Sequence, residues 1–157
     1  MSSETIVTAL FLISAVIAAG VLINAIFPTI TRTAETFGSA SSDADTRIRT
    51  DFKIVNTYAD ASTAKIWCKN IGSARLHTNE VDMGDIYIGS PSNFERISLL
   101  GNYDKDLNNN YWDPGETLSI VLEGDEIDLL PGSAGQDVYV AIVLPNGVRR
   151  DTIFTRS

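Results

Sequence analysis

The feature that most constrains this chain is a long apolar run near its N-terminus, Ile6–Phe27. Only Thr8, Ser14 and Asn24 place polar side chains in it. At about 1.5 Å per residue, a helix of this run is about 33 Å long, which matches a hydrocarbon core of about 30 Å. A lone segment can satisfy its backbone polar groups in lipid only as a helix. The sequence therefore predicts a transmembrane helix over residues 1–31.

The run is expected to be an uncleaved anchor rather than a secretory signal. A cleavable signal has a basic first segment, a shorter apolar stretch and a small-residue cleavage site. The residues before the run, Met1–Thr5, contain no Lys or Arg. A pilin-like helix also follows a Glu, here Glu4, so pilin-like assembly stays open as an alternative. Arg32 would place the C-terminal side inside, but one basic residue is too little to fix the orientation.

Small residues recur on the predicted helix at the spacing of neighbours on one face. Ala15 lies four positions before Ala19, and Ser14 lies four positions before Ala18. Small-xxx-small faces allow two membrane helices to approach closely. A high alanine content gives the same spacing without any packing, so both explanations stay open. Asn24 can hydrogen-bond across a helix pair and favours self-association.

The composition changes after the apolar run. Pro28 is expected to end or kink the helix. Residues 32–47 are rich in Thr, Ser and Ala, with Gly38 as the expected helix stop. This segment is interpreted as a stalk that links the anchor to a separate domain.

Residues 48–157 form the predicted domain, in which apolar residues recur with period two. The predicted strands cover residues 48–58, 64–70, 81–89, 94–100, 117–122, 137–144 and 148–154. Asn146–Gly147 between the last two is a strong hairpin signal. Seven short strands with no helical pattern between them predict a mainly β fold, an immunoglobulin-like antiparallel β-sandwich.

The charge and the motif content narrow the function. The net charge of −8 and a pI near 4.5 argue against nucleic acid as a partner, because that partner requires clustered Lys and Arg. No nucleophile elbow, phosphate-binding loop or paired-histidine zinc motif occurs. Cys68 is expected to be a small strand residue, because a catalytic thiol needs a nearby histidine and His77 is the only one. We therefore expect a protein that is not an enzyme.

One segment has the spacing of a calcium loop. Its oxygen-bearing side chains are Asp104, Asp106, Asn108, Asn110, Asp113 and Glu116. Calcium takes six to eight oxygen ligands, and alternate residues of a tight loop can point to one ion. The match is imperfect, because Asn109 replaces the usual glycine and the closing Glu116 falls one residue late. A solvated Asn/Asp turn has the same composition, so both interpretations stay open and no other cofactor is expected.

Four segments together resemble the G-type stator proteins of the archaeal flagellum, or archaellum. They are Ile66–Ser73 with Leu76 following, Asp85–Ile97, Asp113–Thr117 and Leu144–Val148. With Ser2–Thr5 and the apolar run, the resemblance covers nearly the whole chain. The order and spacing of the segments carry it, because each motif alone is common in β-domains.

The resemblance implies a structural, non-enzymatic part of the motility motor. Such proteins are anchored in the cytoplasmic membrane by one helix, with the C-terminal domain outside the cell in the pseudoperiplasm. They assemble with an F-type stator protein and link the motor to the surface-layer protein. An edge strand is expected to supply the lateral contact, with the first or last strand as the favoured donor.

The alternative is an archaellin- or pilin-like filament subunit, whose apolar helix forms the filament core. Self-association into oligomers or filaments is expected in both cases. Archaeal filament subunits are frequently N-glycosylated, and no Asn-x-Ser/Thr acceptor occurs in this chain. A third alternative is a membrane-tethered domain that binds a soluble ligand.

Overall fold

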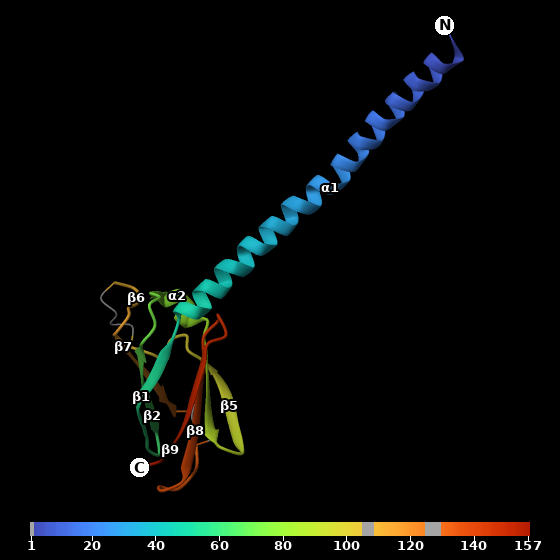
Figure 1. Cartoon of the computed structure of the whole chain (residues 1–157). Helices are drawn as coiled ribbons and strands as arrows, with labels where there is room; N and C mark the ends of the chain where they lie inside the picture. The colour runs from blue at the N-terminus through green and yellow to red at the C-terminus, as the bar shows by residue number, and fades with distance from the viewer. Residues whose placement is uncertain (1, 105–108, 125–129) are drawn as a thin grey trace. The chain divides into compact units, whose positions relative to one another are not determined.

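The computed structural model describes residues 2–104, 109–124 and 130–157 (Figure 1). The chain divides between Asp43 and Ala44 into two units, a helix and a β-domain. The last turn of the helix belongs to the β-domain unit. This boundary lies a few residues before the predicted start of the domain at residue 48.

Helix α1 runs without a break over Ser3–Arg49. Its apolar part is long and apolar enough to cross a membrane. Glu4 lies in the first turn, and Arg47 and Arg49 lie in the last, where these charges complement the helix dipole. No residue of α1 is buried in the chain.

The helix does not end where the sequence predicted. Pro28, expected to end or kink it, lies inside α1 and does not end it, and the helix continues past Gly38, the expected stop, to Arg49. A glycine inside a helix costs only about 1 kcal/mol, which flanking helix formers can offset. One turn after Pro28, the Thr31 hydroxyl donates to the carbonyl oxygens of Phe27 and Pro28 at 3.3 and 3.0 Å, within the same helix. The predicted stalk is therefore a continuation of the helix.

The β-domain contains nine strands in its described residues. The strands are β1 (Phe52–Ala59), β2 (Thr63–Asn70), β3 (Leu76–His77), β4 (Asp85–Ser90), β5 (Asn93–Ser98), β6 (Tyr111–Trp112), β7 (Thr117–Glu123), β8 (Asp137–Val143) and β9 (Arg149–Thr155). A short helix, α2 (Thr78–Asp82), lies between β3 and β4.

The strands form two main sheets and one small pair. Their orders are β1-β2-β7, β5-β4-β8-β9 and β3-β6, and every pairing is antiparallel. The expected fold class, an antiparallel β-sandwich of immunoglobulin-like type after one apolar helix, is confirmed.

Two local predictions in the domain are corrected, and one short strand pair was not predicted. Ile48 is the start of the first predicted strand but lies in the last turn of α1, because alternation over a few residues does not separate a strand from a helix end. Val81 lies in α2, where the His77 ring nitrogen accepts from the Asn79 amide at 3.1 Å and the Glu80 carboxylate accepts from the His77 amide at 2.9 Å. This reciprocal capping explains why the segment is helical. The pair β3-β6 has two residues per strand, too few for a periodic pattern.

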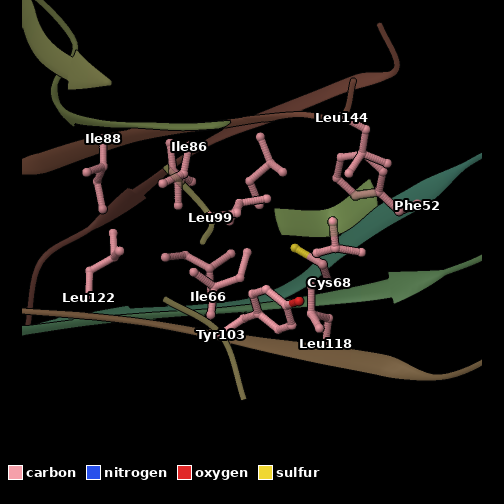
Figure 2. Close-up of a cluster of buried hydrophobic side chains, with 14 of the residues drawn as sticks. Phe52, Ile66, Cys68, Ile86, Ile88, Leu99, Tyr103, Leu118, Leu122 and Leu144 are labelled. Carbon is pink, nitrogen blue, oxygen red and sulfur yellow. The ribbon is translucent and has the colours of Figure 1, made fainter. Parts of the chain in front are cut away.

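The core lies between the two main sheets. Figure 2 shows Ile86 and Ile88 of β4 pointing toward Ile66 and Leu122 of β2 and β7, and all four are fully buried. Cys68 belongs to the same cluster, and burial raises the pKa of its thiol to about 12. A thiol with that pKa is neutral at ordinary pH, so Cys68 acts as a small apolar residue.

Substitution of Ile66 by Ala should destabilise the domain by about 2–5 kcal/mol, because it removes buried methyl groups from a packed core. The measurement is chemical unfolding of the full chain in detergent, followed by tryptophan fluorescence. Lys53→Ala, at an exposed position of β1, is the control and should change stability by less than about 0.5 kcal/mol. Equal midpoints for the two variants would contradict the assigned core.

Candidate functional site: the joint at the end of helix α1

The last turn of α1 ends against a loop of the β-domain that follows β2. We call these two segments, residues 46–51 and 70–74, the joint. Both belong to the β-domain unit. A helix ends with carbonyl groups that have no partner within the helix, so the joint raises the question of what satisfies them.

The loop after β2 binds the last carbonyl of α1 and a carbonyl of the connection that follows it. The Arg49 carbonyl oxygen accepts from the amides of Ser73 and Ala74 at 2.9 and 3.0 Å. The Asp51 carbonyl oxygen accepts from the amides of Ile71 and Gly72 at 3.0 and 2.9 Å. Four consecutive amides of the loop are thus bound to residues 49–51, two of them to the last residue of the helix and two to Asp51 just after it. The helix end is built into the domain rather than tethered to it.

Asn70 holds this loop in shape. Its side-chain amide donates to the carbonyl oxygens of Ala74 and Trp112, both at 3.0 Å, and its side-chain oxygen accepts from the Gly72 amide at 3.0 Å. The side chain is 1% exposed, so each of these bonds is made away from water. A buried amide with all three bonds fixes one loop conformation, because loss of any partner leaves a costly unsatisfied group.

Gly72 is required by close approach. A Cβ atom at this position would lie within 2.5 Å of the Asp51 amide nitrogen and closer still to the Arg49 carbonyl oxygen. Both are backbone atoms, which cannot turn away as a flexible side chain does. The glycine therefore lets the loop reach the helix end.

Side chains add two further contacts at the joint. The Thr50 hydroxyl donates to the Thr46 carbonyl oxygen at 2.8 Å, and Thr50 is 4% exposed. The Arg150 guanidinium of β9 lies 2.5 Å from the Asp51 carboxylate. This ion pair is half-exposed, and its contribution is therefore small. Sequence reasoning missed Thr50, Asp51 and Arg150, because no motif marks them.

Two of the four motifs on which the resemblance rests, Ile66–Ser73 and Asp113–Thr117, meet at the joint. The Asn70 amide donates to the Glu116 carbonyl oxygen at 2.9 Å, and the Gly115 amide donates to the Asn70 carbonyl oxygen at 2.8 Å. The Asp113–Thr117 segment thus braces the Ile66–Ser73 segment. Leu76 is buried beneath them.

A small apolar hollow lies beside the joint. Its volume is about 180 Å³, and its lining includes Thr46, Leu76, Val81, Met83 and Leu144. Pockets for drug-sized ligands are usually about 300–1,000 Å³. The hollow is thus smaller than a typical small-molecule site.

The predicted helix-packing residues lie on α1 and all are exposed. These are Ser14, Ala15, Ala18, Ala19 and Asn24. Two of them bond to their own helix: the Ser14 hydroxyl donates to the Leu10 carbonyl oxygen at 2.9 Å, and the Asn24 side chain donates to the Gly20 carbonyl oxygen at 3.0 Å. In a single chain nothing covers this face, and its role in packing stays a prediction.

The predicted calcium loop is described only in part, since Asp106 and Asn108 lie outside the described residues. The Asp113 carboxylate accepts from the Arg75 guanidinium and from the Asn109 side chain, and the Glu116 carboxylate accepts from the Asp113 amide at 2.8 Å. Asn110 has a positive φ of 60°, and the Asp104 amide donates to β7. Within the described ranges no three His, Cys, Asp or Glu side chains lie close enough to hold a metal. The calcium loop stays a prediction.

Arg75 ties the loop that contains Asp113 to the segment before β3. Its guanidinium pairs with the Asp113 carboxylate and lies 4.6 Å from the centre of the Tyr111 ring. The hydrogen bond from Arg75, followed by that from Asn109, holds the pKa of Asp113 below its ordinary value. The carboxylate that would bind calcium is therefore already paired with a cation.

Substitution of Gly72 by Ala should destabilise the domain by about 1–3 kcal/mol, because the new methyl group meets backbone atoms of the joint. Chemical unfolding of the full chain in detergent measures this. Gly132→Ala is the matched control, since its Cβ meets nothing within 4 Å, and it should change stability by less than about 0.5 kcal/mol. Similar losses in both variants would show that the close approach at Gly72 is not as described.

Arg75→Gln should raise the pKa of Asp113 toward the ordinary value of about 3.9. A carboxyl group with a lowered folded-state pKa stabilises the fold above its unfolded pKa and loses that effect as the pH falls through its folded pKa. The wild-type chain should therefore lose more stability than the variant below about pH 4. NMR titration of the carboxyl carbons measures the pKa. Asp60 is the internal control, because hydrogen bonds from the Ser62 amide and the Tyr58 hydroxyl hold its pKa below the ordinary value without Arg75. An unchanged Asp113 pKa would contradict the pairing.

If the loop binds calcium, the ion should raise the melting temperature of the full chain in detergent. Asp104→Ala together with Asp106→Ala should abolish that rise, because both substitutions remove oxygen ligands. Magnesium at the same concentration is the control for ionic strength. No calcium-dependent rise in the parent chain would end the calcium interpretation.

Comparison with known proteins finds similarity to proteins of the archaeal flagellum. The β-domain has the fold of the archaellum periplasmic stator protein FlaG from Sulfolobus acidocaldarius, with a TM-score of 0.52, 18% identity, and coverage of 67% of this chain and 99% of that chain. A chain in the FlaF–FlaG stator complex of the same organism gives a TM-score of 0.51 at 17% identity, over 66% of this chain and 87% of that chain.

A further solved structure matches the whole chain, including the helix. The archaeal flagellum of Methanospirillum hungatei gives a TM-score of 0.74 at 12% identity, over 100% of this chain and 94% of that chain. These low identities show a shared fold. An uncharacterized protein of Archaeoglobus fulgidus is 30% identical over 168 aligned positions, which cover 99% of each chain. The family model for archaeal-type flagellin matches residues 2–154, and the chain therefore belongs to the archaeal-type flagellin family.

Proposed function

We propose that this chain is a G-type stator protein of the archaellum, a structural part of the motor and not an enzyme. In this role α1 anchors the chain in the cytoplasmic membrane, and the β-domain lies outside the cell in the pseudoperiplasm. The F-type stator protein and the surface-layer protein are its partners. The family and the stator-like fold of the β-domain support a role in the archaellum.

The joint is the observation that carries the proposal. A stator part resists torque, so force on the domain has to reach its anchor without melting the connection. Two loop amides bind the Arg49 carbonyl at the end of α1, two more bind the Asp51 carbonyl just after it, and the buried Asn70 side chain fixes the loop that supplies them. A flexible Gly/Ser linker would transmit force only as an entropic spring. The hydrogen-bonded joint instead supports a role in which force on the domain passes to the helix.

The second half of α1 supports a location in water between membrane and domain. It contains Arg32, Glu35, Asp43 and Asp45, and all four are exposed. Charged side chains are costly inside a bilayer, so the membrane span has to end before Arg32. The remaining helix is about 25 Å long at about 1.5 Å per residue.

A filament subunit is the second candidate function, and one observation favours it. The likeness to the flagellum of Methanospirillum hungatei includes the helix as well as the β-domain. In that role the exposed apolar face of α1, with its small residues Ala15 and Ala19 and its polar Asn24, would pack with copies of itself. The charges from Arg32 onward argue for a solvated stalk rather than a dry filament core.

Shearing of filaments from cells separates the two functions. A tag at the C-terminus of the full chain should remain with the cell envelope after shearing, should co-purify with the F-type stator protein, and deletion of the chain should stop swimming. N-terminal sequencing should find Met1 or Ser2 at the start of an unprocessed anchor. Recovery of the chain in the sheared filaments, with a new terminus at the apolar run, would contradict the stator assignment and support the filament subunit.

A further inference from the structure

The two main sheets have four outer edges, formed by β1, β7, β5 and β9. Strands β1 and β9 lie beside each other, where the Ser157 amide donates to the Ala59 carbonyl oxygen at 3.0 Å. Strand β7 is covered by the segment before residue 105, because the Asp104 amide donates to Ser119 and the Val121 amide donates to Asn102. The first and last strands, which the sequence favoured as contact strands, therefore adjoin each other at one end.

Strand β5 is the edge that stays open. It ends the order β5-β4-β8-β9, and no further strand pairs with it among the described residues. At the end of the strand, the Asn102 side chain donates to the Ser98 carbonyl oxygen at 2.9 Å. Figure 1 shows β5 at the outer side of its sheet. Four of its six residues, Asn93, Phe94, Arg96 and Ser98, are exposed. An open edge is a template for pairing with another strand.

The outer face beside β5 is aromatic. Phe94 is 47% exposed, and its ring centre lies 5.0 Å from that of Tyr139 and 6.4 Å from that of Tyr87. Gly89, opposite Phe94 in the ladder, leaves room for this cluster, because a Cβ there would lie 2.5 Å from the Asn93 carbonyl oxygen. A strand added to β5 would place its outward side chains against Phe94.

The inner face of the same edge presents a carboxylate oxygen without a hydrogen-bond partner among the described residues. Glu95 lies opposite the buried Ile88 in the ladder, and its Oε1 atom is buried with no hydrogen-bond partner among the described residues. Its neighbour Arg96 points to the outer face and pairs with Asp85 at 2.9 Å. Burial of a carboxylate is costly without a cationic or hydrogen-bonding partner. An added strand with a basic side chain opposite Glu95 would supply one.

A second copy of this chain fits the edge poorly. Two copies related by a two-fold axis join their β5 strands antiparallel, and opposite residues then point to the same face. A register centred on Glu95 places two carboxylates opposite each other, and one centred on Arg96 places two guanidinium groups there. Like charges directly opposite are destabilising. Registers centred on Phe94 or Ile97 avoid these pairs but join only about half of the strand.

We infer that β5 is an assembly edge that takes an extended strand from a different polypeptide, with a Lys or Arg of that strand opposite Glu95 and apolar side chains on either side of it. The alternation follows from the strand period, since the basic residue points inward and its neighbours point outward toward Phe94. The identity of that polypeptide as the F-type stator protein rests on the proposed function.

Photo-cross-linking of the full chain in its own cells tests the inference. Benzoylphenylalanine in place of Phe94 should capture a strand of a different polypeptide, and mass spectrometry of the product identifies the captured segment. Glu95→Lys should lower the yield about tenfold, because it sets two cations opposite each other. Exchange of the captured Lys or Arg for Glu should restore it. Glu123→Lys, the same charge change on the covered strand β7, is the matched control and should leave the yield unchanged.

The outcomes separate this inference from the proposed function. Capture of a second copy, no capture at all, or a yield that Glu95→Lys does not change would overturn the assembly edge. If the chain still co-purifies with the F-type stator protein in those cases, the proposed function stands. Capture of a charge-complementary strand from a protein outside the motor would keep the edge and overturn the stator assignment.

Discussion

The end of a helix cannot satisfy its own last carbonyl groups, and the β-domain is arranged around this constraint. The loop after β2 supplies four consecutive amides to the carbonyls of Arg49 and Asp51. That loop keeps its shape because the Asn70 side chain is buried and fully bonded, and it reaches the helix because Gly72 has no Cβ. Without the joint, α1 would enter the domain as a frayed end with exposed polar groups.

Two different surfaces follow from this arrangement. The joint is formed with the Ile66–Ser73 segment, which binds the end of α1, and is braced by the Asp113–Thr117 segment. The segment Asp85–Ile97 forms the hairpin of β4 and β5 and serves the open edge of the four-stranded sheet. A protein that links a membrane anchor to a neighbour needs both functions in one rigid domain. A β-sandwich provides them because its core fixes the joint and the edge in a single packed unit.

The sequence predicted the parts of this structure that depend on periodic patterns. The apolar run gave the helix, and alternation gave β2, β7, β8 and β9 close to their observed bounds. It did not predict that α1 continues to Arg49, because Gly38 is a helix stop only where the chain needs a left-handed residue. Thr50, Asp51 and Arg150 were missed because tertiary contacts, not local spacing, give them their role. The open edge could not be predicted either, since which strands adjoin depends on the topology.

Hydrogen exchange at the loop after β2 measures directly whether the end of α1 is held by the β-domain. The amides of Ile71, Gly72, Ser73 and Ala74 lie outside any strand, and an unattached loop would exchange them rapidly. The hydrogen bonds to Arg49 and Asp51 predict that all four exchange as slowly as the amides of β2 in the full chain in detergent. Exchange of these four amides at the rate of an open loop, while β2 stays protected, would contradict the account.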